Sequence, residues 1–139
     1  MIGLILICHG NLGAELLRTA EGIVGSIEGV RTISNVGIAP ETVTERLCEA
    51  IDSFDDPSGI LLMVDLFGSS CWRVAMTCAA STLKSSTVPV AVLSGMNLGT
   101  VLSFSQKRQT MQFRELAEAM ATDAQRGIIG PKFFGGPSS

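Results

Sequence analysis

The sequence predicts an α/β fold, a doubly wound and mainly parallel sheet of four strands with helices on both faces. Short apolar runs bounded by turn residues alternate with segments of helical spacing, as in buried parallel strands joined by helices. The chain has 139 residues and a hydrophobic content of 46%, which suits one compact domain and is too little for two. In such a sheet we expect the functional site beyond the carboxyl ends of the strands.

The strands and helices follow one another along the chain. Three apolar runs, 4–8, 59–64 and 88–93, predict strands, and 31–36 is a weaker fourth. Helical spacing predicts two early helices, one with Leu16, Ala20, Ile23, Val24 and Ile27, and one with Val43, Leu47, Ile51 and Phe54 after Pro40. A third helix is expected from about Ser70, and a fourth over 111–126.

The composition excludes several classes of partner. A net charge of -3 with only 17% charged residues gives neither a basic surface for nucleic acid nor a polybasic membrane anchor. No apolar run approaches the roughly 20 residues that span a bilayer, and the start lacks the features of a signal peptide. The four cysteines form no CxxC pair, which favours buried thiols in a reducing compartment. We expect a cytoplasmic protein with no direct membrane insertion.

His9 is the only histidine, and it stands with Gly10 directly after the first predicted strand. An imidazole titrates near neutral pH and is a competent nucleophile toward phosphorus. The alternative is a histidine that only caps the strand end by hydrogen bonding, and position alone does not decide between them.

Asp65 follows the apolar run 60–64, so its carboxylate is expected at the same edge of the sheet. If it faces His9, it can accept the Nδ1 proton, fix the tautomer and leave Nε2 free to attack. Asp65 could instead satisfy backbone donors at the start of a helix, and the two roles are compatible.

Gly68, Ser69 and Ser70 lead into the third predicted helix, whose free N–H groups and dipole favour an anion. With Gly10 they are the candidate phosphate-binding residues, although a plain serine N-cap is commoner than a phosphate site. Arg73 could clamp a phosphate or simply lie exposed on the helix. No set of three or four ligands is visible, so we expect neither a metal nor another cofactor.

A thiol-based site at Cys8 and Cys71 is a third and weaker hypothesis. Cys8 stands beside His9, but alternation along the strand directs its side chain into the sheet and away from that imidazole.

Three motifs carry a family resemblance: ILICHG at 5–10, LMVDLFG at 62–68 and SGMNL at 94–98. From Ile2 to about Ile129 the chain resembles the enzyme IIA domains of the mannose class of the phosphoenolpyruvate-dependent sugar phosphotransferase system (PTS). The resemblance implies that 1–130 is a phosphocarrier domain and that 131–139 is a C-terminal tail.

In that family the phosphocarrier protein HPr donates a phosphoryl group to a histidine that matches His9. An aspartate that matches Asp65 orients the imidazole. The group then passes to a IIB domain, which phosphorylates an incoming sugar at a membrane permease. Family members are homodimers that exchange their last strand, which here would come from the apolar segment 127–134.

The sequence departs from the family pattern beside the expected site. Ser69, Ser70, Cys71, Trp72 and Arg73 stand where the family usually has small residues, a proline and an asparagine, and Gly99 replaces a proline. Two uses therefore stay open. The chain is a relay in sugar uptake or, as the changed residues favour, a regulatory module whose phosphorylation state a partner protein senses.

Overall fold

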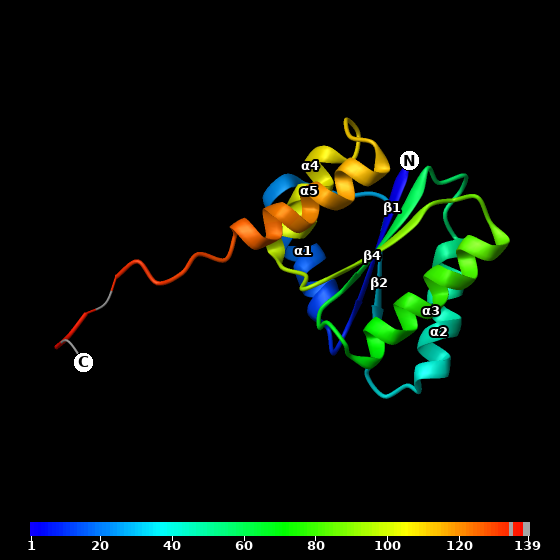
Figure 1. Ribbon diagram of the computed structural model, residues 1–139, viewed down its shortest axis with the longest axis horizontal. Helices are drawn as coiled ribbons and strands as arrows, with labels where there is room; N and C mark the ends of the chain where they lie inside the picture. The colour runs from blue at the N-terminus through cyan, green and yellow to red at the C-terminus, as the bar shows by residue number, and fades with distance from the viewer. Residues whose placement is uncertain (134, 138–139) are drawn as a thin grey trace.

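A computed structural model describes residues 1–133 and 135–137. Its four parallel strands lie in the order β2-β1-β3-β4, with bounds β1 Ile2–Cys8, β2 Val30–Ser34, β3 Gly59–Val64 and β4 Val90–Ser94. The helices of the described residues are α1 Leu12–Val24, α2 Pro40–Asp52, α3 Ser70–Ser85, α4 Leu98–Lys107 and α5 Phe113–Arg126. Figure 1 shows this arrangement, which confirms the doubly wound sheet predicted from the sequence.

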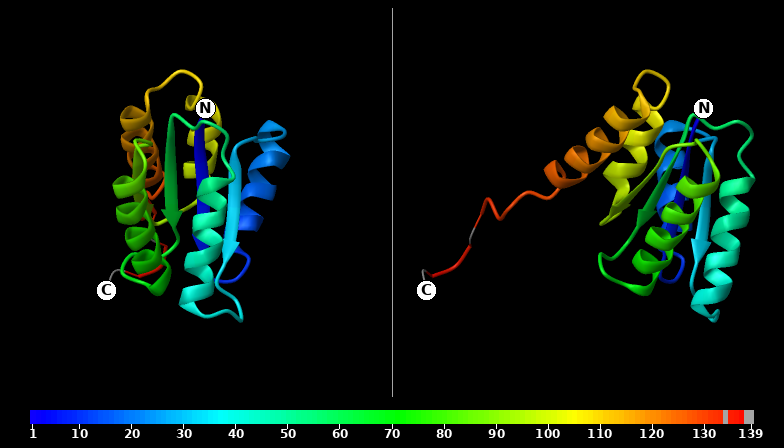
Figure 2. Two further views of the ribbon diagram at one scale, coloured as in Figure 1. Left: turned by 90° about the vertical axis from the view of Figure 1, so that its right-hand side faces the viewer. Right: turned by 45° about the vertical axis from the view of Figure 1, so that its right-hand side comes forward.

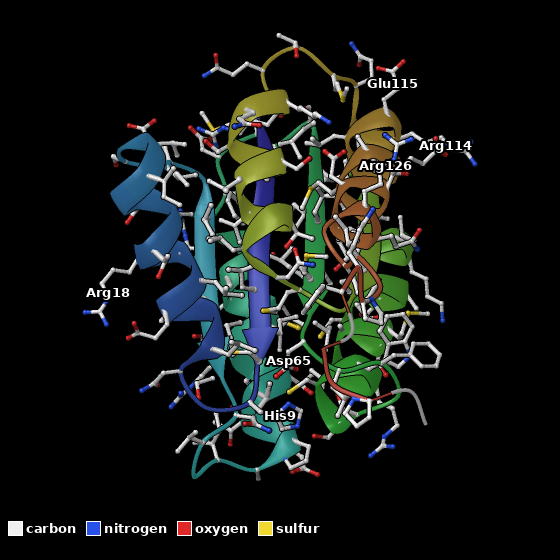
Figure 3. All side chains as sticks on the ribbon, turned by 90° about the vertical axis from the view of Figure 1, so that its left-hand side faces the viewer. His9, Arg18, Asp65, Arg114, Glu115 and Arg126 are labelled. Atoms are coloured by element: carbon white, nitrogen blue, oxygen red, sulfur yellow. The ribbon has the colours of Figure 1, made fainter. Side chains whose placement is uncertain are left out.

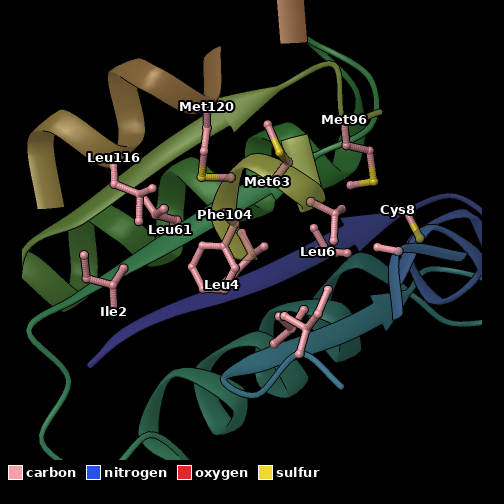
Figure 4. Packing of buried hydrophobic residues seen from close by; sticks show 14 residues of the cluster. Ile2, Leu4, Leu6, Cys8, Leu61, Met63, Met96, Phe104, Leu116 and Met120 are labelled. Atoms are coloured by element: carbon pink, nitrogen blue, oxygen red, sulfur yellow. The ribbon is translucent and has the colours of Figure 1, made fainter. Parts of the chain in front are cut away.

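The two central strands are buried on both faces, because every residue of β1 and β3 is covered. On one face Leu4, Leu6 and Leu61 pack against Phe104 of α4 and Met120 of α5, as Figure 4 shows. On the other face the core comes from β1, β3, α2 and α3, with members that include Ile5, Ile7, Leu47, Leu62 and Val74. Figure 2 shows α2 and α3 side by side on this second face.

The strand order reverses between β1 and β3. From β1 the chain crosses to β2 on one side and later returns to β3 on the other. Ile7 pairs with Val64, and Cys8 pairs with Ser34, so the carboxyl ends of the strands meet at one edge of the sheet. His9 and Asp65 are the first residues beyond β1 and β3, which places them at the crevice where open α/β sheets bind ligands.

Several local predictions are wrong. In α1, Ile23 and Val24 are exposed, and Ile27 lies beyond the helix, which Gly25 ends with a φ of 87°. The helix α4 has no counterpart in the prediction. Cys48 is exposed on α2, whereas the sequence favoured buried thiols throughout.

The chain leaves the domain after α5, as Figure 1 shows. Ile128, Ile129 and Phe133 are 78%, 66% and 85% exposed. Within 127–133 and 135–137 there is no helix or strand. The exchanged strand and the domain boundary at 130 stay predictions, and Phe134 of that segment lies outside the described residues. No helix within the described ranges is long and apolar enough to cross a membrane.

Candidate functional site

His9 and Asp65 contact each other at the edge of the sheet, as Figure 3 shows. The Nδ1 atom of His9 lies 3.0 Å from both carboxylate oxygens of Asp65. The backbone N–H of His9 also donates to Oδ2 of Asp65 at 2.8 Å. Two residues that are 56 positions apart in the sequence are thus joined by both main-chain and side-chain contacts.

The carboxylate determines the tautomer of the imidazole. An ionised carboxylate only accepts hydrogen bonds, so Nδ1 of His9 must be the protonated nitrogen that donates to Asp65. In the neutral ring, Nε2 then carries the free lone pair. The side chain of His9 is 44% exposed, whereas that of Asp65 is 9% exposed. The ring therefore faces solvent while its partner is held inside the edge of the sheet.

Local backbone geometry positions the pair. His9 follows directly on β1, and Gly10 turns the chain with a φ of 58°, a conformation that suits glycine. Gly68 makes the equivalent turn after Asp65, with a φ of 76°. A Cβ atom at either glycine would meet nothing within 4 Å, so the constraint at both positions is conformational and not steric.

The thiols beside the pair are poor nucleophiles. Cys8 is buried, and its Sγ accepts the N–H of Gly13 at 3.1 Å. Burial raises the pKa of the Cys8 thiol, and burial followed by the charge of Asp65 raises the pKa of the Cys71 thiol. Since the thiolate is the reactive form, both side chains stay largely protonated at neutral pH. The hypothesis of a thiol-based site at Cys8 and Cys71 gains no support.

Ser69 caps the start of α3. Its Oγ accepts the N–H of Trp72 at 3.2 Å and donates to the carbonyl of Leu66 at 2.7 Å. The hydroxyl hydrogen is thus already used, so the plain N-cap interpretation describes this side chain. The first N–H groups of α3 still lack partners within the helix, as at any helix start.

A small cavity of about 30 Å³ lies behind the start of α3. Ser70 and Cys71 line it on one side, and Asn35 and Pro40 on the other. It has room for about one water molecule. Asn35 was not among the residues predicted for the site, because the predicted strand ran to residue 36 whereas β2 ends at Ser34. With the correct strand end, Asn35 would have joined the candidate residues at this edge.

Two of the altered residues, Trp72 and Arg73, lie beside an exposed apolar turn, whereas the altered residue Cys71 is buried. Leu66 and Phe67 are 60% and 71% exposed. The ring of Phe67 packs against Trp72 with 4.9 Å between the ring centroids. Arg73 is exposed and makes no ion pair within residues 1–133 and 135–137.

The third motif has a structural role. Asn97 caps α4 through a reciprocal pair of hydrogen bonds with Thr100 and also donates to the carbonyl of Ala124 in α5. Met96 is buried in the core, and Gly99 lies in the first turn of α4. The loop after β4 therefore joins α4 to α5 and presents no free polar group comparable to His9. Across the described part of the chain, no three His, Cys, Asp or Glu side chains form a cluster suited to a metal ion.

Comparisons with known proteins identify the family of this chain. The family model EIIA-man, described as the PTS system fructose IIA component, matches residues 3–121. The mannose-specific EIIAB component of Escherichia coli is 27% identical over 129 residues, which are 91% of this chain and only 38% of that protein.

Solved structures share the fold. The PTS component EIIA from Streptococcus agalactiae superposes with a TM-score of 0.83 at 26% identity, covering 94% of this chain and 97% of that one. The mannose/sorbose-specific IIA subunit from Enterococcus faecalis gives 0.78 at 19% identity, over 97% and 98% of the two chains. The match to the family model covers most of the chain, so this protein belongs to the EIIA-man family and is a IIA phosphocarrier component of a sugar phosphotransferase system.

Proposed function

We propose that His9 carries the phosphoryl group on Nε2, receiving it from phospho-HPr and passing it to a IIB domain. The observation that supports this assignment is the pair of 3.0 Å contacts between Nδ1 of His9 and the carboxylate of Asp65. They support a proton on Nδ1 and the other ring nitrogen, Nε2, as the nucleophile.

The transfer is a displacement at phosphorus. The lone pair of Nε2 forms an N–P bond while the N–P bond to the histidine of HPr breaks, and that histidine keeps the electron pair. The imidazole of His9 gains positive charge as the bond forms, and the carboxylate of Asp65 stabilises this charge through Nδ1–H. Transfer to the IIB domain reverses these roles.

The start of α3 is the proposed phosphate cradle. The first N–H groups of α3, those of Ser70 and Cys71, precede the N–H that Ser69 caps, and together with the positive end of the helix dipole they favour the phosphoryl oxygens. Gly10 and Gly68 lack side chains, so the backbone can approach the phosphoryl group closely. Ser70 is half-buried at this turn and can supply a hydroxyl, whereas Ser69 contributes by holding the helix start in place.

Labelling tests the assignment. Phosphoenolpyruvate with enzyme I and HPr is expected to label the protein once, with an acid-labile and base-stable bond, and ³¹P NMR should assign it to Nε2. His9→Ala should accept no label. Cys8→Ala is the matched control, since it changes the adjacent side chain and leaves the imidazole. Label that persists in His9→Ala, or that resists acid, contradicts the proposal.

The proposed partners and cellular location follow from this phosphoryl transfer. HPr is the proposed donor, a IIB domain the proposed acceptor, and the cytoplasm the proposed place of the reaction. No relative named above favours the alternative, a regulatory module without sugar transport. That alternative predicts a stable complex between a partner protein and only one phosphorylation state, which a pull-down with the phosphorylated protein and with His9→Ala would reveal.

We further propose a homodimer held by the segment after α5. Among residues 1–133 and 135–137 no strand pairs with the outer edge of β4, and β4 is only partly buried. An exposed strand edge beside an exposed apolar segment favours pairing between two chains. Sedimentation should find a dimer for the intact chain and a monomer after truncation behind Arg126. A dimer that survives this truncation excludes the exchange.

A further inference from the structure

Two cysteines outside the phosphoryl site touch each other. The Sγ atoms of Cys48 on α2 and Cys78 on α3 lie 3.6 Å apart. Cys78 is only 2% exposed, whereas Cys48 is exposed to solvent. Within the described residues this is the only contact between two cysteine sulfurs, and neither residue takes part in the proposed phosphoryl transfer.

The contact is a consequence of helix packing. α2 and α3 lie side by side on one face of the sheet, and Figure 2 shows their close packing. A disulfide requires sulfurs about 2.05 Å apart, so the two thiols must approach by only about 1.5 Å. Rotations about the side-chain bonds can supply much of such a movement. The two sulfurs are therefore in van der Waals contact and close to bonding range.

We propose that Cys48 and Cys78 form a modification site at which a small-molecule disulfide oxidises the two thiols to one disulfide between α2 and α3. The exposed Cys48 meets the oxidant, and the buried Cys78 resolves the adduct. This division follows from accessibility, because the oxidant reaches only one of the two sulfurs.

The chemistry is a two-step thiol–disulfide exchange. The thiolate of Cys48 attacks oxidised glutathione, forms a mixed disulfide and releases one glutathione thiolate. Cys78 then loses its proton and attacks the sulfur of Cys48, which releases the second glutathione. Two thiols lose two hydrogens and two electrons, and one oxidised glutathione becomes two reduced molecules.

The environment of Cys78 disfavours its thiolate, so the resolving step depends on the contact with Cys48. Burial, followed by the neighbouring Cys48, raises the pKa of the Cys78 thiol to about 12. Cys78 is thus protonated before oxidation, as the buried Cys8 and Cys71 thiols are, and it resolves the adduct only because the sulfur of Cys48 is held 3.6 Å away. In a reducing compartment such a pair forms a transient and reversible bond, the usual form of intracellular disulfides.

Peptide mapping of the folded protein tests the proposal. After incubation with oxidised glutathione, free thiols are blocked and the chain is digested with trypsin and an Asp-specific protease. Both cleavages are needed, because Cys48 and Cys71 share one tryptic peptide that cleavage at Asp52 divides. We expect a Cys48–Cys78 linked peptide, with Cys8 and Cys71 still available for blocking after denaturation. A link to Cys71, or a glutathione adduct that stays on Cys48, overturns the proposal.

Variants separate the two roles. Cys78→Ser should retain a stable glutathione adduct on Cys48, because no resolving thiol remains. Cys48→Ser should form neither the adduct nor the link, and its exposed position leaves the fold intact. Cys71→Ser is the matched control and should still form the Cys48–Cys78 disulfide. If Cys48→Ser still yields oxidised Cys78, the entry of the oxidant at Cys48 is wrong.

Discussion

Two helices begin directly beyond neighbouring strands of the same sheet, and their starts differ. At α3 the turn after β3 is open, with Leu66 and Phe67 in solvent and Asp65 bonded to His9. At α4 the turn after β4 is closed, with Met96 buried and Asn97 bonded to both α4 and α5. Both starts have a capping side chain, so a capped helix start does not identify a site. The feature that marks the start of α3 as the candidate site is the reversal of strand order beside β3.

The largest effect is expected at Asp65. Asp65→Asn keeps the shape of the side chain but removes the charge that stabilises the developing imidazolium. Phosphoryl transfer from HPr should slow by about 10²- to 10⁴-fold. Single-turnover labelling measures the rate, and urea unfolding shows whether the fold persists. If Asp65→Asn transfers the phosphoryl group at the wild-type rate and is equally stable, the start of α3 does not differ in function from the start of α4.

Substitutions at the two helix caps should affect stability and phosphoryl transfer differently. Asn97→Ala removes the cap of α4 and the bond to Ala124, so it should lower the free energy of unfolding by about 1–2 kcal/mol. Its transfer rate should match the wild type wherever both are folded. Ser69→Ala should cost about 1 kcal/mol and also slow transfer, because the start of α3 loosens. Equal effects of both variants on transfer would contradict the distinction.

The exposed surface beside the site should affect partner choice more than chemistry. Trp72→Ala and Arg73→Ala should change transfer to a IIB domain by roughly threefold to tenfold, since these residues replace the family's usual ones. Acceptance from HPr is the internal comparison and should change less. A IIB domain from a mannose-specific system that accepts equally well from wild type and both variants would show that this surface does not select the acceptor.

The smallest effect on stability is expected at Asp123 in α5, the helix that packs against α4. Hydrogen bonds from Lys107, then from Ser103, lower the pKa of Asp123 in α5. A carboxyl whose pKa is lower in the folded state stabilises the fold above its unfolded value of about 4, and this contribution disappears as the pH falls through the folded value. Asp123→Asn should therefore be less stable than wild type at pH 7, and the difference should shrink toward pH 3.

A matched variant controls for the loss of charge. Glu118→Gln removes the same charge from the same helix, but Glu118 has an exposed side chain that pairs with Arg114, which is also exposed. Its stability should stay close to that of the wild type at pH 7. Thermal unfolding of both variants across the pH range decides whether the Asp123 contacts, and not general charge, stabilise the packing of α4 against α5.

The sequence supported the prediction that His9 and Asp65 lie together, because each residue directly follows a strongly apolar strand. It selected Gly68, Ser69 and Ser70 as phosphate-binding candidates, but it did not predict that a second helix begins after Gly95–Asn97. The helix α4 escaped prediction because its ten residues include glycine, threonine and two serines, which weaken the helical pattern. Likewise, the exposure of Cys48 and its contact with Cys78 depend on how α2 packs against α3, which helical spacing alone does not specify.

Because β1 and β3 are buried on both faces, this protein tolerates substitutions in these strands less than in the turns beside them. His9 and Asp65 are attached to the two segments that tolerate substitution least, because any change there disturbs packing on two sides of the sheet. Phe67 lies in the exposed turn after β3, and the partly exposed Trp72 and the exposed Arg73 lie in the first turn of α3. Mutation can therefore exchange the proposed docking partner without altering the proposed reacting atoms of His9 and Asp65, so that one inherited chemistry can serve different acceptors.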